Sequence, residues 1–274
     1  MRTGGLSWRQ RSAAAARPGG ATRAPWALAV LALLLGLVVG VAVYAPARWL
    51  EPWVARSGHL QLIDSRGTLW SGSARLVLSA GSGSRERAVL PDRVQWRLAL
   101  NGAGLRLHVH AVCCMHEAIQ LDLAAPGGQP QITLAPHQSL WPAEPLAALG
   151  TPLNTLRPAG RLLLRTQALH WRWDGARVQM NGQASLELQD FASALSTLKP
   201  MGHYRIELRG GPQPSLSLQT LQGALQLKGQ GQWQAGRLRF EGQASAQPEY
   251  EAALSNVLNI IGRRSGALSL ISIS

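Results

Sequence analysis

The sequence of 274 residues has little of what most catalytic sites require. Asp and Glu number only 14 together and mostly stand singly, and there are seven His and two Cys. No Gly-x-Ser-x-Gly segment, P-loop, Gly-x-Gly-x-x-Gly after a strand, or paired-carboxylate arrangement occurs. We therefore predict that the protein is not an enzyme, has no catalytic residues and binds no cofactor.

Lysine is nearly absent, with 2 residues against 25 arginines, and the net charge is +13. Five arginines precede a long apolar run without any accompanying acid: Arg2, Arg9, Arg11, Arg17 and Arg23. The remaining basic surplus suits nucleic acid, anionic lipid or an acidic partner, and does not choose among them. Because no Lys/Arg cluster with interleaved aromatics and no zinc-finger or RNA-binding signature occurs, we predict no binding to nucleic acid.

Residues 26–45 (WALAVLALLLGLVVGVAVYA) contain no charged residue. As a helix this run is about 30 Å long, which matches the hydrocarbon thickness of a bilayer, so it predicts a transmembrane helix. Interfacial aromatics are expected at Trp26, Tyr44, Trp49 and Trp53. A cleaved signal peptide is the alternative, and the long apolar region, the extended basic leader and Pro46 disfavour it.

The charge distribution around this run predicts the topology. Five arginines before it, against Arg48 and Arg56 after it, place the N-terminus in the cytoplasm by the positive-inside rule. In a Gram-negative bacterium, this predicts a single-pass inner-membrane protein with a periplasmic C-terminal domain. The expected parts are a basic cytoplasmic leader (1–25), the span (26–45), a juxtamembrane linker (46–60) and a periplasmic β domain (61–274).

Beyond residue 60 the apolar residues recur with a period of two. In 94–100 (VQWRLAL) and 105–112 (LRLHVHAV), apolar side chains alternate with polar ones, as in an antiparallel sheet with one wet face. We predict a mainly β fold, in which one N-terminal transmembrane helix precedes an extended antiparallel sheet or sandwich with a few short helices. Helical spacing predicts those helices within 143–149, 190–200 and 249–264.

Residues 173–185 (WDGARVQMNGQAS) align without gaps to 233–245 (WQAGRLRFEGQAS). Each copy predicts a strand ending in Trp, a tight turn containing Gly175 or Gly236, and a returning strand. The repeat predicts either duplicated hairpins in one extended sheet or convergence on common turn residues.

The segment 107–117 (LHVHAVCCMHE) contains residue types that ligate zinc or copper. His108, His110 and His116 are the candidates, but the spacing matches no metal motif, so we predict no metal site. Cys113 and Cys114 are expected to form a vicinal disulfide in an oxidising periplasm, with a bond to a partner protein as the alternative.

Residues 67–74 (GTLWSGSA) surround one Trp with small residues inside an expected strand. The small residues allow another backbone or side chain to approach, while Trp70 supplies either a buried anchor or a contact for a partner.

An ordered set of motifs resembles the type II secretion system protein N family from the span to the C-terminus. The motifs are GTLWSG (67–72), LNTLRPAG (153–160), LSTLKPMG (195–202) and NVLNIIGR (256–263). The resemblance implies an accessory inner-membrane component for the export of folded periplasmic proteins across the outer membrane. It implies as partners the inner-membrane platform, the pseudopilus and the outer-membrane secretin, and it offers no catalytic residues.

A single span followed by an amphipathic sheet also looks like the AsmA-type proteins, whose sheets curl into an apolar groove that handles lipid. Leucines at 216, 218, 221, 225 and 227 would line such a groove or pack under a helix. We favour a secretion scaffold that offers an exposed sheet edge or a flat face to its neighbours. The candidate partner contacts are Trp70, Trp173, Trp233, Arg263 and Arg264.

Overall fold

The computed structural model describes residues 23–81, 83–84, 86–102, 104–175, 177–234 and 236–273. The predicted leader therefore lies almost wholly outside the described residues. Two compact units make up the chain, Met1–Val43 and Tyr44–Ser274.

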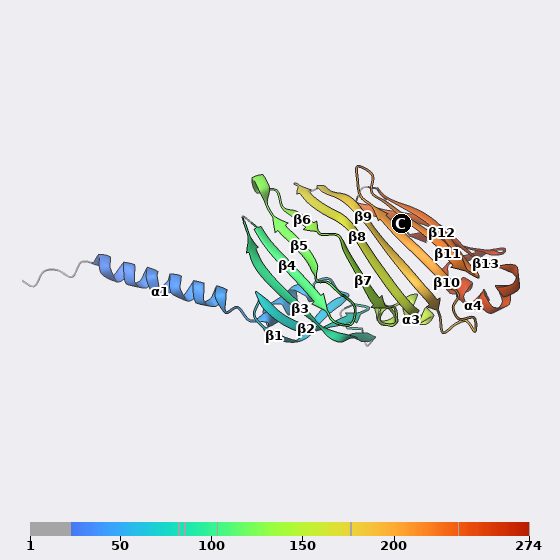
Figure 1. The fold of residues 1–274 in the computed structure, drawn as a ribbon, viewed down its shortest axis with the longest axis horizontal. Helices are drawn as coiled ribbons and strands as arrows, with labels where there is room; N and C mark the ends of the chain where they lie inside the picture. Colours follow the sequence, from blue (N-terminus) through green and yellow to red (C-terminus); the bar gives the residue numbers. More distant parts are fainter. Residues whose placement is uncertain are drawn as a thin grey trace, which may run out of the picture. The chain divides into compact units, whose positions relative to one another are not determined.

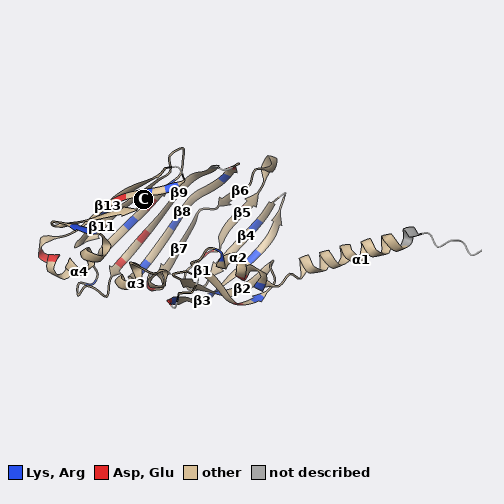
Figure 2. Ribbon diagram, turned by 180° about the vertical axis from the view of Figure 1, so that it is seen from behind, with Lys and Arg blue, Asp and Glu red and all other residues tan. Residues whose placement is uncertain are grey.

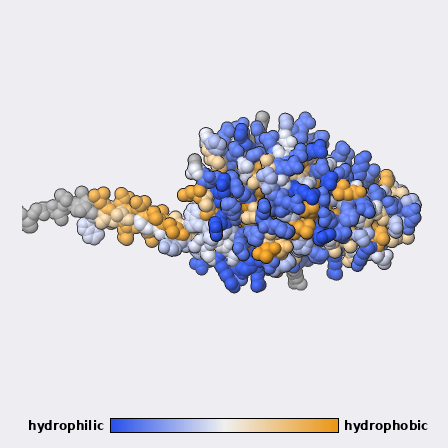
Figure 3. Space-filling view, in the orientation of Figure 1, coloured by the Kyte–Doolittle hydropathy of each residue, from blue (hydrophilic) through white to orange (hydrophobic). Residues whose placement is uncertain are grey.

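The first unit contributes one described helix, α1 (Arg23–Val43). Within the described part of the chain, Trp26–Val43 is the one helical segment long and apolar enough to cross a membrane, and none of it is buried. Figure 3 shows apolar atoms along α1 and a largely polar surface over the sheet unit on the side in view.

The second unit is built on a single antiparallel sheet of 15 strands, so the predicted mainly β fold is confirmed, as one sheet and not a sandwich (Figure 1). The order is β1-β2-β3-β4-β5-β6-β8-β9-β10-β11-β12-β13-β15-β14, and β7 pairs with β8 beside β6. The strands are β1 (Leu60–Gly67), β2 (Ser71–Ser79), β3 (Arg87–Asn101), β4 (Gly104–Ala111), β5 (Ile119–Ala124), β6 (Gln131–Leu134), β7 (His137–Pro142), β8 (Ala159–Asp174), β9 (Arg177–Ala192), β10 (Gly202–Arg209), β11 (Ser215–Gly223), β12 (Leu225–Gln234), β13 (Arg237–Ala246), β14 (Arg263–Ser265) and β15 (Leu268–Ile273).

Short helices lie before and between the strands. They are η1 (Ala47–Leu50), α2 (Glu51–Ala55), η2 (Pro126–Gly128), η3 (Glu144–Leu149), α3 (Leu153–Leu156), η4 (Pro248–Tyr250) and α4 (Glu251–Ile261). The helix expected within 249–264 is therefore present as η4 and α4, and the one expected at 143–149 is a 3-10 helix.

The helix expected within 190–200 is wrong. Strand β9 continues to Ala192, and turns follow it. Phe191 is buried in the sheet opposite Gly202, and its carbonyl accepts a hydrogen bond from the Met201 N–H at 2.7 Å. Strand pairing and burial of this ring outweigh the helical spacing of the apolar residues.

The main core lies where α4 packs on the apolar face of the sheet. Leu254, Val257 and Leu258 of α4 are fully buried against Leu225 of β12 and Ala244 of β13. Burial of each such leucine contributes about 1.5–3 kcal/mol. The helix therefore fixes the C-terminal end of the sheet, from β10 to β15.

Both copies of the internal repeat form β-hairpins, as predicted. Trp173 pairs with Val178 across the β8–β9 turn, and Trp233 pairs with Leu238 across the β12–β13 turn. Gly175 (φ 58°) and Gly236 (φ 80°) supply the left-handed backbone that these turns require. The two hairpins belong to the same sheet, two strands apart.

Candidate interaction surface

The polar face of the sheet carries most of the charged side chains, because strand alternation places every second residue on it. Figure 2 marks Lys and Arg in blue and Asp and Glu in red along these strands. Charged groups come together at several places on this face, among them β1–β3, β8–β10 and β12–β15.

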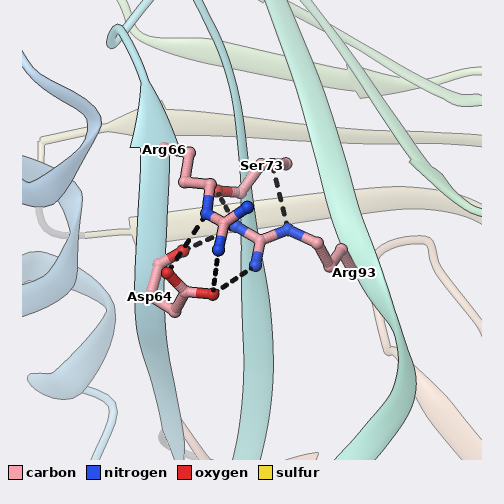
Figure 4. A network of polar contacts seen from close by, with 4 residues as sticks. All are labelled: Asp64, Arg66, Ser73 and Arg93. Carbon is pink, nitrogen blue, oxygen red and sulfur yellow. Dashed lines mark hydrogen bonds and ion pairs between the residues drawn. The ribbon is translucent and has the colours of Figure 1, made fainter.

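The first place is a bulge in the edge strand β1, drawn in Figure 4. Arg93 reaches from β3 across β2 and donates to a carboxylate oxygen and to the carbonyl oxygen of Asp64, both at 2.6 Å. Arg66 donates twice to the same carboxylate at 3.2 Å, and Arg93 also donates to the Ser73 hydroxyl at 3.2 Å. The hydrogen bonds from Arg93 and Arg66 hold the pKa of Asp64 below its ordinary value.

This network lies at an irregular part of the sheet's edge. Asp64 has a φ of 53°, and the pairing of β1 with β2 shifts register between Ile63 and Arg66. At the end of β1, Pro46 forms a bridge with Thr68. A bulge, fixed charges and a covering segment are the devices by which proteins prevent strand addition at an exposed edge. This edge therefore does not suit docking by an added strand.

The second place is Glu187 on β9, which lies between Arg165 of β8 and Arg205 of β10. Its carboxylate accepts hydrogen bonds from Arg205 at 2.9 Å and from Arg165 at 3.0 Å. Burial alone would raise the pKa of Glu187, but the hydrogen bond and charge of Arg205 and the charge of Arg165 outweigh it, so the pKa lies below 4.5. The carboxylate therefore joins three central strands.

Replacement of Glu187 with Gln is expected to lower the free energy of unfolding by about 1–2 kcal/mol at neutral pH, because a charged acceptor shared by two guanidinium groups is lost. Since folding lowers the pKa of Glu187, its contribution is present above pH 4.5 and is lost as the pH falls through the folded value. Urea unfolding of the parent chain and of the Glu187→Gln variant, at pH 7 and near pH 4, measures this difference in the free energy of unfolding. A difference that fails to shrink in acid would contradict the assignment.

The third place is a shallow polar depression of about 1080 Å³ on β12–β15. We call it the C-terminal depression. Its polar lining comprises Lys228, Gln230, Gln232, Gln234, Arg239, Glu241, Gln243, Arg263 and Ser272. Among the residues described, no ion pair neutralises Lys228, Arg239 or Arg263. The depression is thus net basic and rich in amide groups, so it suits a partner surface with acidic and polar side chains.

Glycines shape the other face of the same strands. The missing side chains of Gly231 and Gly242 leave room for the ring of Phe240, whose carbon atoms would lie 3.1 Å from a Cβ at either position. Phe240 is buried. In 228–232 (KGQGQ), the glycines therefore leave space for the Phe240 ring on the apolar face. The glutamines between them line the C-terminal depression on the polar face.

The two predicted arginine contacts point to opposite faces, because they are neighbours in β14. Arg263 lines the C-terminal depression. Arg264 lies 3.7 Å from Glu251 of α4, on the other face. The structure therefore does not combine them into one basic patch.

None of the three predicted tryptophan contacts lines the C-terminal depression with Arg263. Trp173 and Trp233 lie on the apolar face, half-buried, at the ends of the two repeated hairpins. Trp70 lies in the turn between β1 and β2, half-buried, and not in a strand as expected. The buried tryptophan at this place is Trp96 of β3. Its ring fits because residue 72 is glycine, since a Cβ on Gly72 would lie 2.6 Å from the Trp96 ring.

The histidine and cysteine segment forms the end of β4 and the turn that follows. His108 and His110 lie on β4, and His116 is exposed in the turn. Within the described ranges, no three His, Cys, Asp or Glu residues gather as metal ligands would. Cys113 and Cys114 are joined by a disulfide, and the Cys114 carbonyl accepts the N–H of Leu140 at 2.8 Å. This turn thereby continues the sheet next to β7.

The sequence reasoning missed the groups that organise the polar face: Asp64, Arg93, Glu187, Lys228 and Arg239. The arginines and glutamines at alternate positions of β12 and β13 were a usable signal, because alternation alone places them on one face. The ion pairs across β1–β3 and β8–β10 depend on strand register, which local sequence does not determine.

A family model, described as type II secretion system (T2SS), protein N, matches residues 58–270. The match covers nearly the whole sheet unit, including the C-terminal depression except Ile271 and Ser272. No curated protein and no solved structure matches the chain.

Proposed function

The chain belongs to the type II secretion system protein N family, and we propose that it acts in that system as a membrane-anchored, non-enzymatic scaffold. In this role it supports the export of folded proteins from the periplasm across the outer membrane. The family match to 58–270 is the observation that carries the proposal.

The anchor in this proposal is α1, whose segment Trp26–Val43 has the length and composition of a membrane span. The arginine-rich leader lies in the cytoplasm and the sheet unit in the periplasm, according to the positive-inside rule. The protein is then a single-pass component of the bacterial inner membrane, and the strands of its β domain begin at Leu60.

The docking face in this proposal is the C-terminal depression. Its unneutralised cations, Lys228, Arg239 and Arg263, favour a neighbouring component with acidic side chains. The candidate neighbours are the inner-membrane platform, the pseudopilus and the outer-membrane secretin. The blunted edge at β1 favours contact through a face over strand addition.

Deletion of the gene is expected to trap a normally secreted enzyme in the periplasm while the outer membrane stays intact. The measurement is the enzyme's activity in the periplasm and in the medium, with sensitivity to detergent as the permeability control. Full recovery of export by a plasmid copy excludes effects on neighbouring genes. Normal export from the deletion strain would contradict the proposal.

Lipid handling by an AsmA-like groove predicts the opposite pair of results, normal export and a leaky outer membrane. The leucines named for such a groove serve largely as core: Leu225 is fully buried under α4, and Leu218 and Leu227 pack against the same cluster. The structure therefore favours the second reading of these leucines, in which they pack beneath a helix.

A further inference from the structure

The segment that follows α1 is attached to the sheet almost at once. Only Tyr44, Ala45 and Pro46 separate Val43 from η1. Ala45 is 3 % exposed, and its carbonyl accepts the N–H of Leu69 at 2.8 Å, while Pro46 forms a β-bridge with Thr68. The expected linker (46–60) is thus folded against β1 and β2.

One side of η1 belongs to the core of the sheet unit. Ala47 is 1 % exposed and forms a cluster with Ala74 of β2 and Trp96 of β3, against which Leu50 also packs. Residues 47 and 50 are three apart and therefore share a face of the helical turn. This packing fixes the direction in which the rest of the segment points.

Large exposed aromatic side chains lie at Trp49 of η1 and at Trp53 of α2. Trp49 is 49 % exposed and Trp53 is 67 % exposed. The guanidinium carbon of Arg56 lies 4.4 Å from the centre of the Trp53 ring, and Arg48 is also exposed. Two tryptophans with adjacent arginines combine apolar rings, N–H donors and positive charge, which is the chemistry of the headgroup layer of a bilayer.

We infer that Trp49 and Trp53, with Arg48 and Arg56, rest in the headgroup layer of the bilayer that α1 crosses. The inference depends on the span in the proposed function. Three extended residues reach at most about 10 Å, so η1 begins close to the end of the span. Ala45 and Ala47 pack within the sheet unit. Contact of the tryptophans with lipid therefore keeps the whole β domain at the membrane surface, and the domain is not joined to the span by a free linker.

Lipid is the occupant that the chain itself specifies. The outer headgroup layer extends about 5–8 Å beyond the hydrocarbon, and the three connecting residues reach at most about 10 Å, so η1 begins inside this layer or within a few ångströms of it. Arginine side chains at this depth pair with lipid phosphates, and the rings lie at the boundary with the acyl chains. A protein partner at this surface would itself have to lie at the membrane, and it would exclude lipid from Trp53.

Quenching of tryptophan fluorescence by brominated lipids tests the inference. The full chain is reconstituted in vesicles of phosphatidylethanolamine and phosphatidylglycerol, with bromine on acyl carbons next to the headgroup. The test variant is Trp49→Phe with Trp53→Phe. The matched control is Trp173→Phe with Trp233→Phe, which removes two half-buried rings from β8 and β12. A Trp26→Phe variant reports insertion of α1 separately.

The expected result is a smaller quenched intensity in the Trp49/Trp53 variant, in which Trp26 is still quenched, and an unchanged quenched intensity in the Trp173/Trp233 control. If Trp26 is quenched and the Trp49/Trp53 variant is quenched as strongly as the parent chain, the inference is wrong, but the proposal that α1 is a membrane anchor remains. If Trp26 is not quenched either, the proposed membrane span is wrong, and so is the inferred contact of Trp49 and Trp53 with the headgroup layer.

Discussion

The Leu258→Ala variant is expected to lose about 2–5 kcal/mol of its free energy of unfolding, because the truncation leaves a cavity in the main core. Leu258 lies on α4 with no exposed surface, between Leu254 and Val257 and the strands beneath them. Its carbonyl also accepts the Ser269 hydroxyl of β15 at 2.7 Å. Loss of packing here therefore loosens the strands that carry the C-terminal depression.

The same helix supplies the control for this variant. Ile260 is 41 % exposed, so Ile260→Ala removes a similar apolar group from the surface and is expected to change stability by less than about 0.5 kcal/mol. Urea unfolding of the full chain in mild detergent, followed by tryptophan fluorescence, measures both variants. Equal stability of the two variants would show that α4 does not form the core described here.

The period-two pattern predicted the class of fold because each strand has one apolar and one polar face. The alternation in 94–100 and in 105–111 lies within the paired strands β3 and β4. The repeated Trp–Gly hairpins could also be predicted from the sequence, since a tight turn with a left-handed glycine depends on only a few consecutive residues.

Other features could not be predicted because they depend on contacts between distant segments. The residues around Phe191 have helical spacing, yet pairing with β10 holds that ring in the sheet. Arg263 and Arg264 were both expected to contact a partner, but they are neighbours in β14, and successive strand residues face opposite ways.

Charge reversal in the C-terminal depression is expected to disrupt assembly. Arg239→Glu with Arg263→Glu should lower recovery of the neighbouring secretion component about tenfold or more, because like charges then face each other across the contact. Both side chains are exposed, so the fold is expected to remain within about 0.5 kcal/mol of the parent. Co-purification from detergent-solubilised membranes measures the effect.

A matched control separates the position of the charge from its amount. Arg97→Glu with Arg172→Glu changes the net charge equally, but Arg97 lies on β3 and Arg172 on β8, both exposed and outside the C-terminal depression. This variant is expected to recover the partner like the parent chain. Equal loss in both variants would indicate a general effect of charge and would reject the C-terminal depression as the docking face.

The most direct test of the scaffold role is the location of a secreted enzyme in a deletion strain that carries one of these two variants at the native level. We expect the enzyme to accumulate in the periplasm with Arg239→Glu and Arg263→Glu, and to reach the medium with the matched control. Normal export with the charge-reversed depression, in a strain where the empty deletion retains the enzyme, would contradict the account.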